Sequence, residues 1–266
     1  MLTSSDPSDE PLTDRTVDGF HRGRFFLVQP AKGGHRAGMD ALVLAAATPS
    51  GFAGMAVDFG AGAGAVGFAV AARCPAARVL LVERSPEMVS FARLSLANAG
   101  NSHLASRIDI LQTDVSLAGR AREAAGLRDR SADFVLMNPP FNEPIDRSTP
   151  NELRREAHVG SGSVFADWLR SAAAVLKPRG KVALIARPSS LADILTALSG
   201  RFGGAEILPV YATLSRPAIR IVVRAIRGAR GAPSIMPPLV LHREEDQSFT
   251  AEADAILSGE SSLFDD

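Results

Sequence analysis

Short apolar runs alternate with helix-length amphipathic segments through most of the chain. The apolar runs are rich in Val, Ile, Leu and Met, which is typical of buried strands. The predicted strands are residues 55–59, 78–83, 108–111, 132–137 and 182–186, and the predicted helices are residues 41–47, 65–73, 85–99, 164–176 and 190–201. Strands that alternate with helices of this length favour right-handed crossovers, so the pattern predicts a parallel sheet.

Two later apolar runs, 206–211 and 219–226, break this alternation. No helix-length segment separates them, so they are predicted to form an antiparallel hairpin. With the earlier strands they give an α/β fold whose sheet is seven-stranded, mostly parallel and closed by a C-terminal antiparallel hairpin. The short run 25–28 is predicted to belong to another hairpin, which turns at residues 32–34.

The hydrophobic pattern fades at both ends of the chain. Residues 1–20 are acidic and rich in Pro and Ser, which predicts a flexible tail, and residues 233–266 form an acidic C-terminal extension. The body, 21–232, is predicted to be one catalytic domain, in which residues 21–50 add a hairpin and a helix before the sheet. The sequence has neither a long apolar run nor a signal-peptide pattern, so we expect a cytoplasmic protein with no membrane partner.

The formal net charge of zero conceals an uneven distribution. Residues 1–20 and 241–266 together carry −11, and residues 21–240 therefore carry +11. A basic body is compatible with a polyanionic partner such as RNA, although a solvated Arg-rich surface would give the same balance. The single cysteine, Cys74, excludes an internal disulfide framework, and the scattered histidines give no metal-ligand cluster, so no metal is expected.

Glycines follow the first core strand in the sequence DFGAGAG of residues 58–64. They allow a tight turn and close approach of a ligand at the carboxyl end of a parallel strand. The spacing also satisfies the dinucleotide fingerprint, so an NAD site is a rival. A carboxylate before the first glycine favours the ammonium of a methionine moiety, because it would repel a pyrophosphate. The candidate cofactor-binding residues are Asp58, Gly60, Gly62 and Gly64.

Two more carboxylates follow the next two predicted strands. Glu83 ends the second strand, where it can accept hydrogen bonds from both hydroxyls of a ribose. Asp114 follows the third strand, where it can accept from an adenine amino group. The structural alternatives are a solvated charge for Glu83 and a turn or cap residue for Asp114. With the glycines, these residues predict a site for S-adenosylmethionine.

The most informative stretch is the tetrapeptide NPPF, which directly follows the fourth predicted strand. Its prolines remove two backbone donors and leave carbonyl groups to accept, and its asparagine adds a side-chain carbonyl. Two acceptors that hold the protons of an amino group on a π-system can pull its nitrogen toward tetrahedral geometry as a methyl group arrives, while the phenyl ring stacks on the planar substrate. The alternative is an ordinary Pro-Pro turn. The candidate catalytic residues are Asn138, Pro139, Pro140 and Phe141.

The two motifs together resemble the amino-methyltransferase branch of class I methyltransferases, which have a Rossmann-like fold with a late antiparallel hairpin. Within it the chain most resembles the bacterial tRNA(Val) adenine-N6 methyltransferase family, through FLVQP at 26–30 and HRAGMDALVL at 35–44. The resemblance covers about residues 20–230. It implies S-adenosylmethionine as cofactor and adenine N6 in tRNA as acceptor. It further implies that the cofactor's methionine end is lined by Arg36, Gly38 and Asp40, with Asp58, Glu83, Asp114 and Asn138 completing the site.

Other functions stay open at this point. A protein glutamine has a planar amide that suits the same acceptors, but such enzymes usually carry a helical recognition domain, and few residues precede Asp58. A small-molecule O-methyltransferase would have no use for paired acceptors. Neither an NAD oxidoreductase nor a silent cofactor-binding or RNA-binding module accounts for an intact NPPF.

Three further features lie outside these motifs. The predicted loop 142–163 contains several arginines and is interpreted as a lid over the acceptor. Arg216, Arg220 and Arg224 share one parity, so on a straight strand they share a face, which either contacts phosphates or carries ordinary charges at the end of the sheet. Trp168 has the helical spacing of a core residue.

Overall fold

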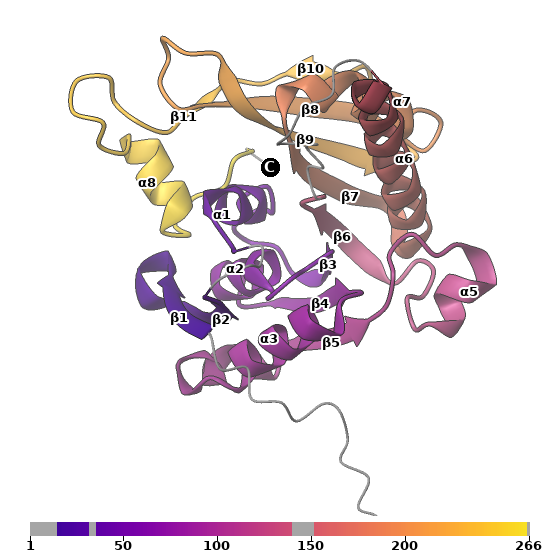
Figure 1. Ribbon diagram of the computed structural model, residues 1–266, viewed down its shortest axis with the longest axis horizontal. Coiled ribbons are helices and arrows are strands. Elements are labelled where there is room, and N and C mark those ends of the chain that lie inside the picture. Colours follow the sequence, from indigo (N-terminus) through magenta and orange to yellow (C-terminus); the bar gives the residue numbers. More distant parts are fainter. Residues whose placement is uncertain (1–14, 32–35, 140–151, 265–266) are drawn as a thin grey trace, which may run out of the picture.

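The computed structural model describes residues 15–31, 36–139 and 152–264, and for residues 152–163 it describes the backbone alone. One large sheet with helices on both faces forms the body (Figure 1). From one side to the other its main strands are β8 (Phe202–Tyr211), β9 (Ala218–Arg227), β7 (Leu176–Ala186), β6 (Ala132–Met137), β3 (Gly54–Phe59), β4 (Ala77–Glu83) and β5 (Ile108–Gln112). The strands from β7 to β5 are parallel, and β9 is antiparallel to both β7 and β8. The predicted mostly parallel sheet with a late antiparallel hairpin is confirmed.

Helices cover the sheet in two layers. One layer contains α1 (Met39–Ala45), α2 (Ala65–Arg73) and α3 (Pro86–Ala97), and the other contains α6 (Glu152–Val175) and α7 (Leu191–Leu198). The connections hold α4 (Ser102–Ala105), α5 (Gly119–Ala124) and the 3-10 turns His21–Gly23, Ala99–Asn101 and Pro188–Ser190. None of the helices in the described ranges has the length and apolar character to cross a membrane.

In the central strand β6, the four residues that follow Asp133 form one continuous apolar run. Phe134 and Leu136 pack in the layer of α1 and α2, whereas Val135 and Met137 pack in the layer of α6 and α7. None of the four is more than 1% exposed. A strand that is buried on both faces needs apolar residues at every position, so it loses the polar alternation of a half-exposed strand.

The C-terminal extension is folded against the body. Its short strands β10 (Ser234–Ile235) and β11 (Leu239–Val240) pair with β8 and enlarge the sheet beyond the seven predicted strands. Helix α8 (Ala251–Leu257) packs against α1, and Phe264 is only 2% exposed. The sequence analysis described this segment only as acidic, because the few apolar residues that hold it in place form no long apolar run.

An N-terminal hairpin corrects two expectations. Strand β1 (Arg15–Phe20) falls in the predicted tail, and it pairs with β2 (Phe25–Pro30), so the partner of β2 precedes it in the chain. The turn between them has positive φ at His21, Arg22 and Gly23. The turn predicted after β2 lies outside the described residues. Every second residue of β1 is exposed, so the strand has no apolar run that would reveal it.

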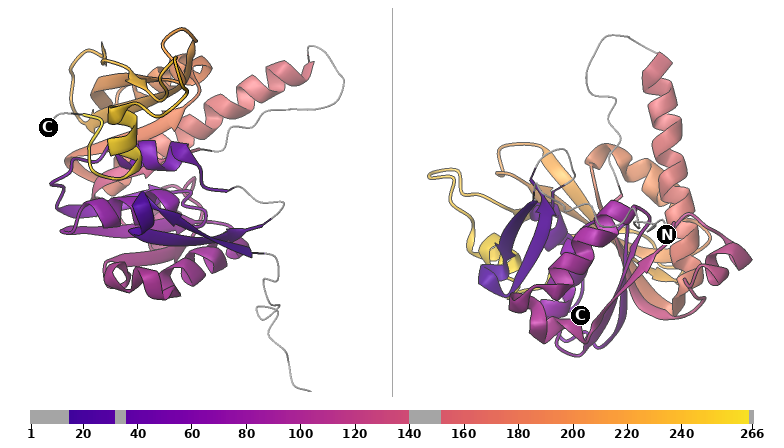
Figure 2. Two further views of the ribbon diagram at one scale, coloured as in Figure 1. Left: turned by 90° about the vertical axis from the view of Figure 1, so that its left-hand side faces the viewer. Right: turned by 60° about the horizontal axis from the view of Figure 1, so that its bottom comes forward.

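Helix α6 corrects the predicted loop 142–163, because its backbone is helical from Glu152 onward. Figure 2 shows this helix projecting beyond the sheet. Its first half contains Gly160 and Gly162, and glycine lowers helix propensity, which explains the loop interpretation. The remainder of the predicted lid, 142–151, lies outside the described residues.

Candidate functional site

The carboxyl ends of neighbouring parallel strands bring the predicted site residues to one edge of the sheet. Strand β3 ends at Phe59 and leads into the glycine turn, and Phe59 pairs with Met137 at the end of β6. Strand β4 ends at Glu83, β5 leads to Asp114, and β6 leads to Asn138. We call this region the carboxyl edge. In parallel α/β sheets, ligands bind outside the carboxyl ends of the strands.

The glycine turn has the backbone conformation that its sequence predicts. Gly60, Gly62 and Gly64 have φ values of +68°, +57° and +98°, which side chains other than hydrogen rarely tolerate. A Cβ on Gly60 would lie 2.5 Å from the ring of Trp168, so this indole packs directly on the turn. Around Gly62, the only described heavy atom beyond its chain neighbours within 4 Å of such a Cβ would be the Met88 methyl, at 3.6 Å. The turn therefore has an open face at Gly62.

Asp58 lies behind the turn. Its side chain is 2% exposed, and its Oδ2 accepts a 2.9 Å hydrogen bond from the backbone N–H of Gly67 in α2. Burial raises the pKa of the Asp58 carboxyl to about 7; the bond from Gly67 offsets part of this rise, and the nearby Glu83 adds to it. In this structure Asp58 fixes the turn to α2, and its contact with a ligand ammonium stays a prediction.

Glu83 is held at the front of the turn. Its Oε2 accepts from the Gly62 N–H at 2.9 Å, and its Oε1 accepts from the Ser85 N–H at 2.8 Å. The side chain is part-buried, and each carboxylate oxygen has lone pairs for a second donor. An oriented carboxylate of this kind suits a pair of neighbouring hydroxyls.

Asp114 lies at the next strand end, where its side chain is 39% exposed. Its Oδ1 accepts from the Ser116 N–H at 2.8 Å, and a guanidinium nitrogen of Arg84 lies 3.9 Å from its Oδ2. Burial alone would raise the pKa of the Asp114 carboxyl, but hydrogen bonds from Ser116 and the charge of Arg84 lower it overall. Asp114 is therefore ionised at neutral pH and acts as an acceptor only.

Asn138 directly follows Met137 on the carboxyl edge. Its side chain is part-buried, and Pro139 beside it is buried. The side-chain carbonyl of Asn138 can accept a hydrogen bond, and Pro139 has no N–H to compete for acceptors. The other two motif residues, Pro140 and Phe141, lie outside the described residues.

The three residues expected at the methionine end lie at the start of α1. Arg36 is hydrogen-bonded to Asp18 of β1, and Asp40 forms a 2.8 Å ion pair with Arg220 of β9. Gly38 precedes the helix, and no described heavy atom outside its chain neighbours would lie within 4 Å of a Cβ there. Two ion pairs thus hold this segment from opposite sides.

The expected common face holds for Arg220 and Arg224 of β9, but Arg216 precedes the strand, and the prediction that the face contacts phosphates fails at Arg224. The Arg224 side chain is 4% exposed, pairs with Glu206 at 2.7 Å and lies 4.1 Å from the ring centroid of Phe264. It therefore cannot contact a phosphate. Arg220 pairs with Asp40, and Arg216 is exposed in the turn before β9 rather than in the strand. The C-terminal extension covers Arg224, and strand parity contains no information about that contact.

Some residues of the region were missed by the sequence analysis. Trp168 packs against the α6 and α7 layer, as expected for a core residue, but it also touches the glycine turn. Asp18 and Gln29 belong to the N-terminal hairpin and contact Arg36 and its neighbour in the chain. The only signal for Asp18 was an alternation of polar and apolar residues over a few positions, too short to distinguish from a tail, and Gln29 lay in the FLVQP segment without an assigned role.

The described residues fit a nucleoside cofactor. The glycine turn is open at Gly62, the adjacent Glu83 suits ribose hydroxyls, and Asp114 lies one strand further along with an ionised carboxylate. Within the described ranges, no group of three or more His, Cys, Asp or Glu side chains is arranged to hold a metal ion.

Comparisons with known proteins agree with this geometry. The model of a family described as methyltransferase small domain matches residues 36–210. Among solved structures, a predicted O-methyltransferase from Agrobacterium tumefaciens is 38% identical, with a TM-score of 0.74. The match covers 84% of this chain and 97% of that one.

Two curated relatives are more distant. The tRNA1(Val) (adenine(37)-N6)-methyltransferase of Porphyromonas gingivalis is 30% identical over 60% of this chain and 61% of its own length. The release factor glutamine methyltransferase of Moorella thermoacetica is 28% identical over 60% of this chain and 56% of its own length. The chain therefore spans less than two thirds of the length of these relatives.

Proposed function

The chain belongs to the methyltransferase small domain family, and from this premise we propose that it methylates adenine N6 in RNA, with tRNA as the substrate. It is an S-adenosylmethionine-dependent methyltransferase. One observation carries the proposal about the acceptor. Asn138 and Pro139 lie at the end of β6, directly beside the strand that leads into the glycine turn.

The cofactor roles follow from the side chains at the carboxyl edge that can form further hydrogen bonds. When bound, S-adenosylmethionine supplies a methyl group on a positively charged sulfur. We assign Glu83 to the ribose hydroxyls and Asp114 to the adenine amino group, because both are oriented carboxylates that can accept further hydrogen bonds. The open backbone at Gly62 allows close approach. Arg36 is assigned to the carboxylate of the methionine moiety, since it keeps N–H donors beyond those it uses toward the described residues.

The acceptor chemistry follows from the NPPF motif. An adenine amino group is a poor nucleophile because its lone pair is delocalised into the ring. The Asn138 side-chain carbonyl and a backbone carbonyl of the motif would accept its two N–H protons and favour a tetrahedral nitrogen. Both acceptors stabilise the positive charge that develops on that nitrogen, so they act mainly in the transition state. No strong base is required, since the proton leaves after the methyl group has been transferred.

RNA is favoured over other acceptors by two observations. One relative of this chain is named as a tRNA adenine-N6 methyltransferase. In addition, Arg84 follows Glu83 on the carboxyl edge and is 76% exposed, and the exposed Arg216 lies in the turn that leads into β9 at the same edge. Exposed guanidinium groups beside an acceptor site suit the phosphates that flank a target base.

A second candidate acceptor is a protein glutamine. The Moorella relative is named for that substrate, and a planar amide would use the same two acceptors. The two candidates differ in charge, because a glutamine loop in a protein has no array of phosphates. Binding of RNA should weaken steeply with salt, whereas binding of a protein loop should depend on salt much less.

The test is incubation of the full chain with labelled S-adenosylmethionine and total tRNA, followed by nucleoside analysis. We expect label in N6-methyladenosine, and about a hundredfold slower labelling when Asn138→Ala is used. A parallel reaction contains a bacterial release factor. Label in the release factor with none in nucleosides would replace the RNA proposal with the glutamine alternative.

A further inference from the structure

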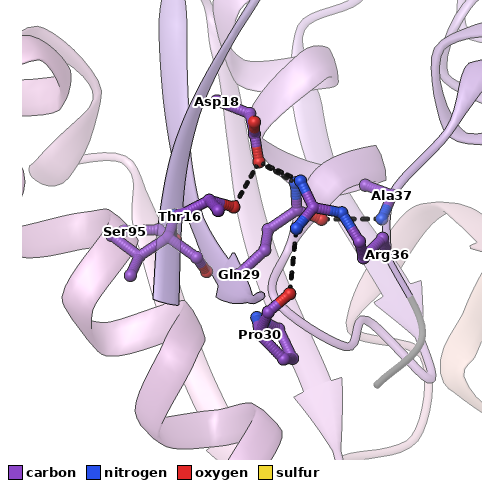
Figure 3. Close-up of polar contacts among 8 residues, drawn as sticks. Thr16, Asp18, Gln29, Pro30, Arg36, Ala37 and Ser95 are labelled. Carbon is purple, nitrogen blue, oxygen red and sulfur yellow. Dashed lines mark hydrogen bonds and ion pairs between the residues drawn. The ribbon is translucent and has the colours of Figure 1, made fainter. Parts of the chain in front are cut away.

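A dense polar network lies between the N-terminal hairpin and the segment before α1 (Figure 3). One carboxylate oxygen, Oδ2 of Asp18, accepts hydrogen bonds from Thr16 Oγ1 at 2.9 Å, Gln29 Nε2 at 2.9 Å and an Arg36 guanidinium nitrogen at 2.8 Å. An ionised acceptor makes each of these bonds stronger than a neutral one. Three donors from three segments thus converge on one atom.

Gln29 extends the network from Arg36 to Ala37, the next residue in the chain. It is 1% exposed, and while its amide nitrogen donates to Asp18, its Oε1 accepts from the Ala37 N–H at 2.7 Å. Arg36 donates a further bond to the Pro30 carbonyl at 3.0 Å. The two residues immediately before Gly38 are therefore fixed by side chains and backbone of the hairpin.

The hairpin is itself anchored to the body, so it can act as a rigid support. In β2, the Val28 N–H donates to Ser95 Oγ at 2.8 Å, and the Phe26 N–H donates to Asn101 Oδ1 at 2.9 Å. Both acceptor residues are fully buried, and Asn101 also donates back to the Phe26 carbonyl at 2.7 Å. Figure 2 shows the hairpin beside α3, which carries Ser95.

The supported segment reaches the carboxyl edge. Asp40, two residues after Gly38, pairs with Arg220, and the next residue of β9, Ile221, pairs with Ala186 at the carboxyl end of β7. Strand β6 neighbours β7 and ends at Met137, directly before Asn138. Residues 36–40 therefore lie at the edge where the acceptor motif begins.

We propose that Asp18 and Gln29 are positioning residues, which act through Arg36 and the Ala37 backbone to hold residues 36–38 as one wall of the cofactor site. This inference rests on the proposed role of Arg36 toward the methionine carboxylate. Both residues precede the region matched by the family model, which begins at Arg36. The guanidinium uses two of its five N–H donors for Asp18 and Pro30, and its side chain is 40% exposed. A fixed guanidinium loses less conformational entropy when it binds an anion, which favours a preorganised site.

The test is calorimetric titration of the full chain with S-adenosylhomocysteine, which needs no methyl acceptor. Asp18→Asn and Gln29→Ala are each expected to raise Kd by roughly tenfold, equivalent to about 1.4 kcal/mol. The Asp18→Glu variant keeps the charge and should recover part of the affinity. At saturating cofactor the turnover rate should stay near the wild-type value, so KM for the cofactor changes and kcat does not.

A matched control lies in the turn of the same hairpin. Arg22 forms exposed ion pairs with Asp254 and Glu260 of the C-terminal extension. The Arg22→Gln variant removes ion pairs of the hairpin without touching residues 36–38, so it should leave Kd unchanged. Melting temperatures of all variants separate a loss of folding from a loss of positioning.

A double-mutant cycle tests whether Asp18 affects cofactor affinity through Arg36. In an Arg36→Ala background, Asp18→Asn should change Kd by less than about twofold, because residues that act through one another are not additive. Equal effects in both backgrounds, or wild-type Kd for a folded Asp18→Asn variant, would overturn the positioning role. Failure of the wild type itself to bind S-adenosylhomocysteine would overturn the cofactor roles and the positioning role with them, whereas a failed RNA assay leaves this titration unaffected.

Discussion

The carboxyl edge and the C-terminal extension belong to the same sheet but differ in how far their polar groups are already bonded within the protein. At the carboxyl edge, polar groups keep bonding capacity: Glu83 uses each oxygen once, and the turn is open at Gly62. In the extension, the polar and apolar groups each contact a partner in the body of the protein. Arg224 lies between Glu206 and the ring of Phe264, and the Leu263 N–H donates to a carbonyl of the body, that of Ala46, at 2.8 Å.

This difference separates binding from stability. Polar groups that are left without a full set of partners cost stability, and folded proteins keep few of them away from functional sites. The extension instead closes one side of the core, and its contacts with the body leave few hydrogen-bonding groups for a ligand. Changes at the edge should therefore alter ligand binding and turnover, whereas changes in the extension should alter the free energy of unfolding.

The largest expected effect is on stability, from Phe264→Ala. Removing a buried phenyl ring costs about 3–5 kcal/mol of unfolding free energy, because it leaves a cavity. Here it also exposes the Arg224 guanidinium that packs on the ring. Urea unfolding measures the loss, and affinity for S-adenosylhomocysteine should not change in the folded protein. Phe249→Ala is the matched control, since that ring is 44% exposed and should cost much less. Equal losses for both rings would contradict the packing role of Phe264.

The next largest effect is on turnover, from Asn138→Ala. It should lower kcat by about a hundredfold, or about 2.7 kcal/mol of transition-state stabilisation, because an acceptor for the amino protons is lost. Urea unfolding should stay near the wild-type midpoint. Asn138→Asp keeps an acceptor at the same position and should retain more activity than the alanine variant. Single-turnover methylation of an accepted RNA gives both rates, and a wild-type rate for Asn138→Ala would rule out the paired-acceptor mechanism.

A smaller effect on affinity is expected from Glu83→Ala. Loss of charged hydrogen bonds to a ribose should weaken cofactor binding by about 1–3 kcal/mol. Calorimetric titration with S-adenosylhomocysteine measures this change. Glu87→Ala, an exposed glutamate in the first turn of α3, is the matched control and should bind normally. If both variants bind as the wild type does, Glu83 is only a support for the turn.

The last comparison concerns the slope of stability against pH, for which the two regions should give opposite signs. Asp58 at the carboxyl edge has its pKa raised from 3.8 to about 7 by burial, so the folded state holds its proton more tightly than the unfolded state. Its contribution to stability falls as pH rises from about 4 to about 7. The slope is at most about 1.4 kcal/mol per pH unit for one proton.

His21 lies against Gly259 of the extension and has the opposite dependence. Burial, with the charges of Arg73 and Arg24, lowers the pKa of its imidazole from 6.5 to about 4. The unfolded state therefore takes up the proton first, and stability is lost as pH falls from 6.5 toward 4.

Urea unfolding over a pH series separates the two contributions. Asp58→Asn should make the protein lose stability more steeply toward acid pH, because the His21 contribution is left unopposed. His21→Phe should make stability increase toward acid pH over the same range. Parallel slopes for the two variants would show that these groups do not titrate as the structure indicates.

Most of the central sheet followed from the sequence because its signals are local. Strand β6 is apolar at every position from Phe134 to Met137 since both of its faces are buried there, and the glycines at 60, 62 and 64 have the spacing of the turn they form. The strand ends could then be aligned by the rule that parallel strands share a carboxyl edge. The placement of Glu83, Asp114 and Asn138 on one edge was therefore predictable without coordinates.

The predictions that failed concern contacts between segments distant in sequence. Strand β1 was taken for a tail, because its stability comes from pairing with β2 and from the network around Asp18. The first half of α6 was taken for a loop, because its glycines weaken the helical pattern. Arg224 was taken for a surface residue, and only the returning extension buries it.

The sequence by itself determined the order of the central strands and of the helices between them, the glycine turn and the position of the acceptor motif, since each depends on neighbours within a few residues. The tertiary structure alone decided that Asp58 faces α2 and that Asp18 holds Arg36. It also decided that the acidic C-terminal segment completes the core. These outcomes depend on burial and on hydrogen bonds between segments far apart in the chain, and residue spacing does not encode them.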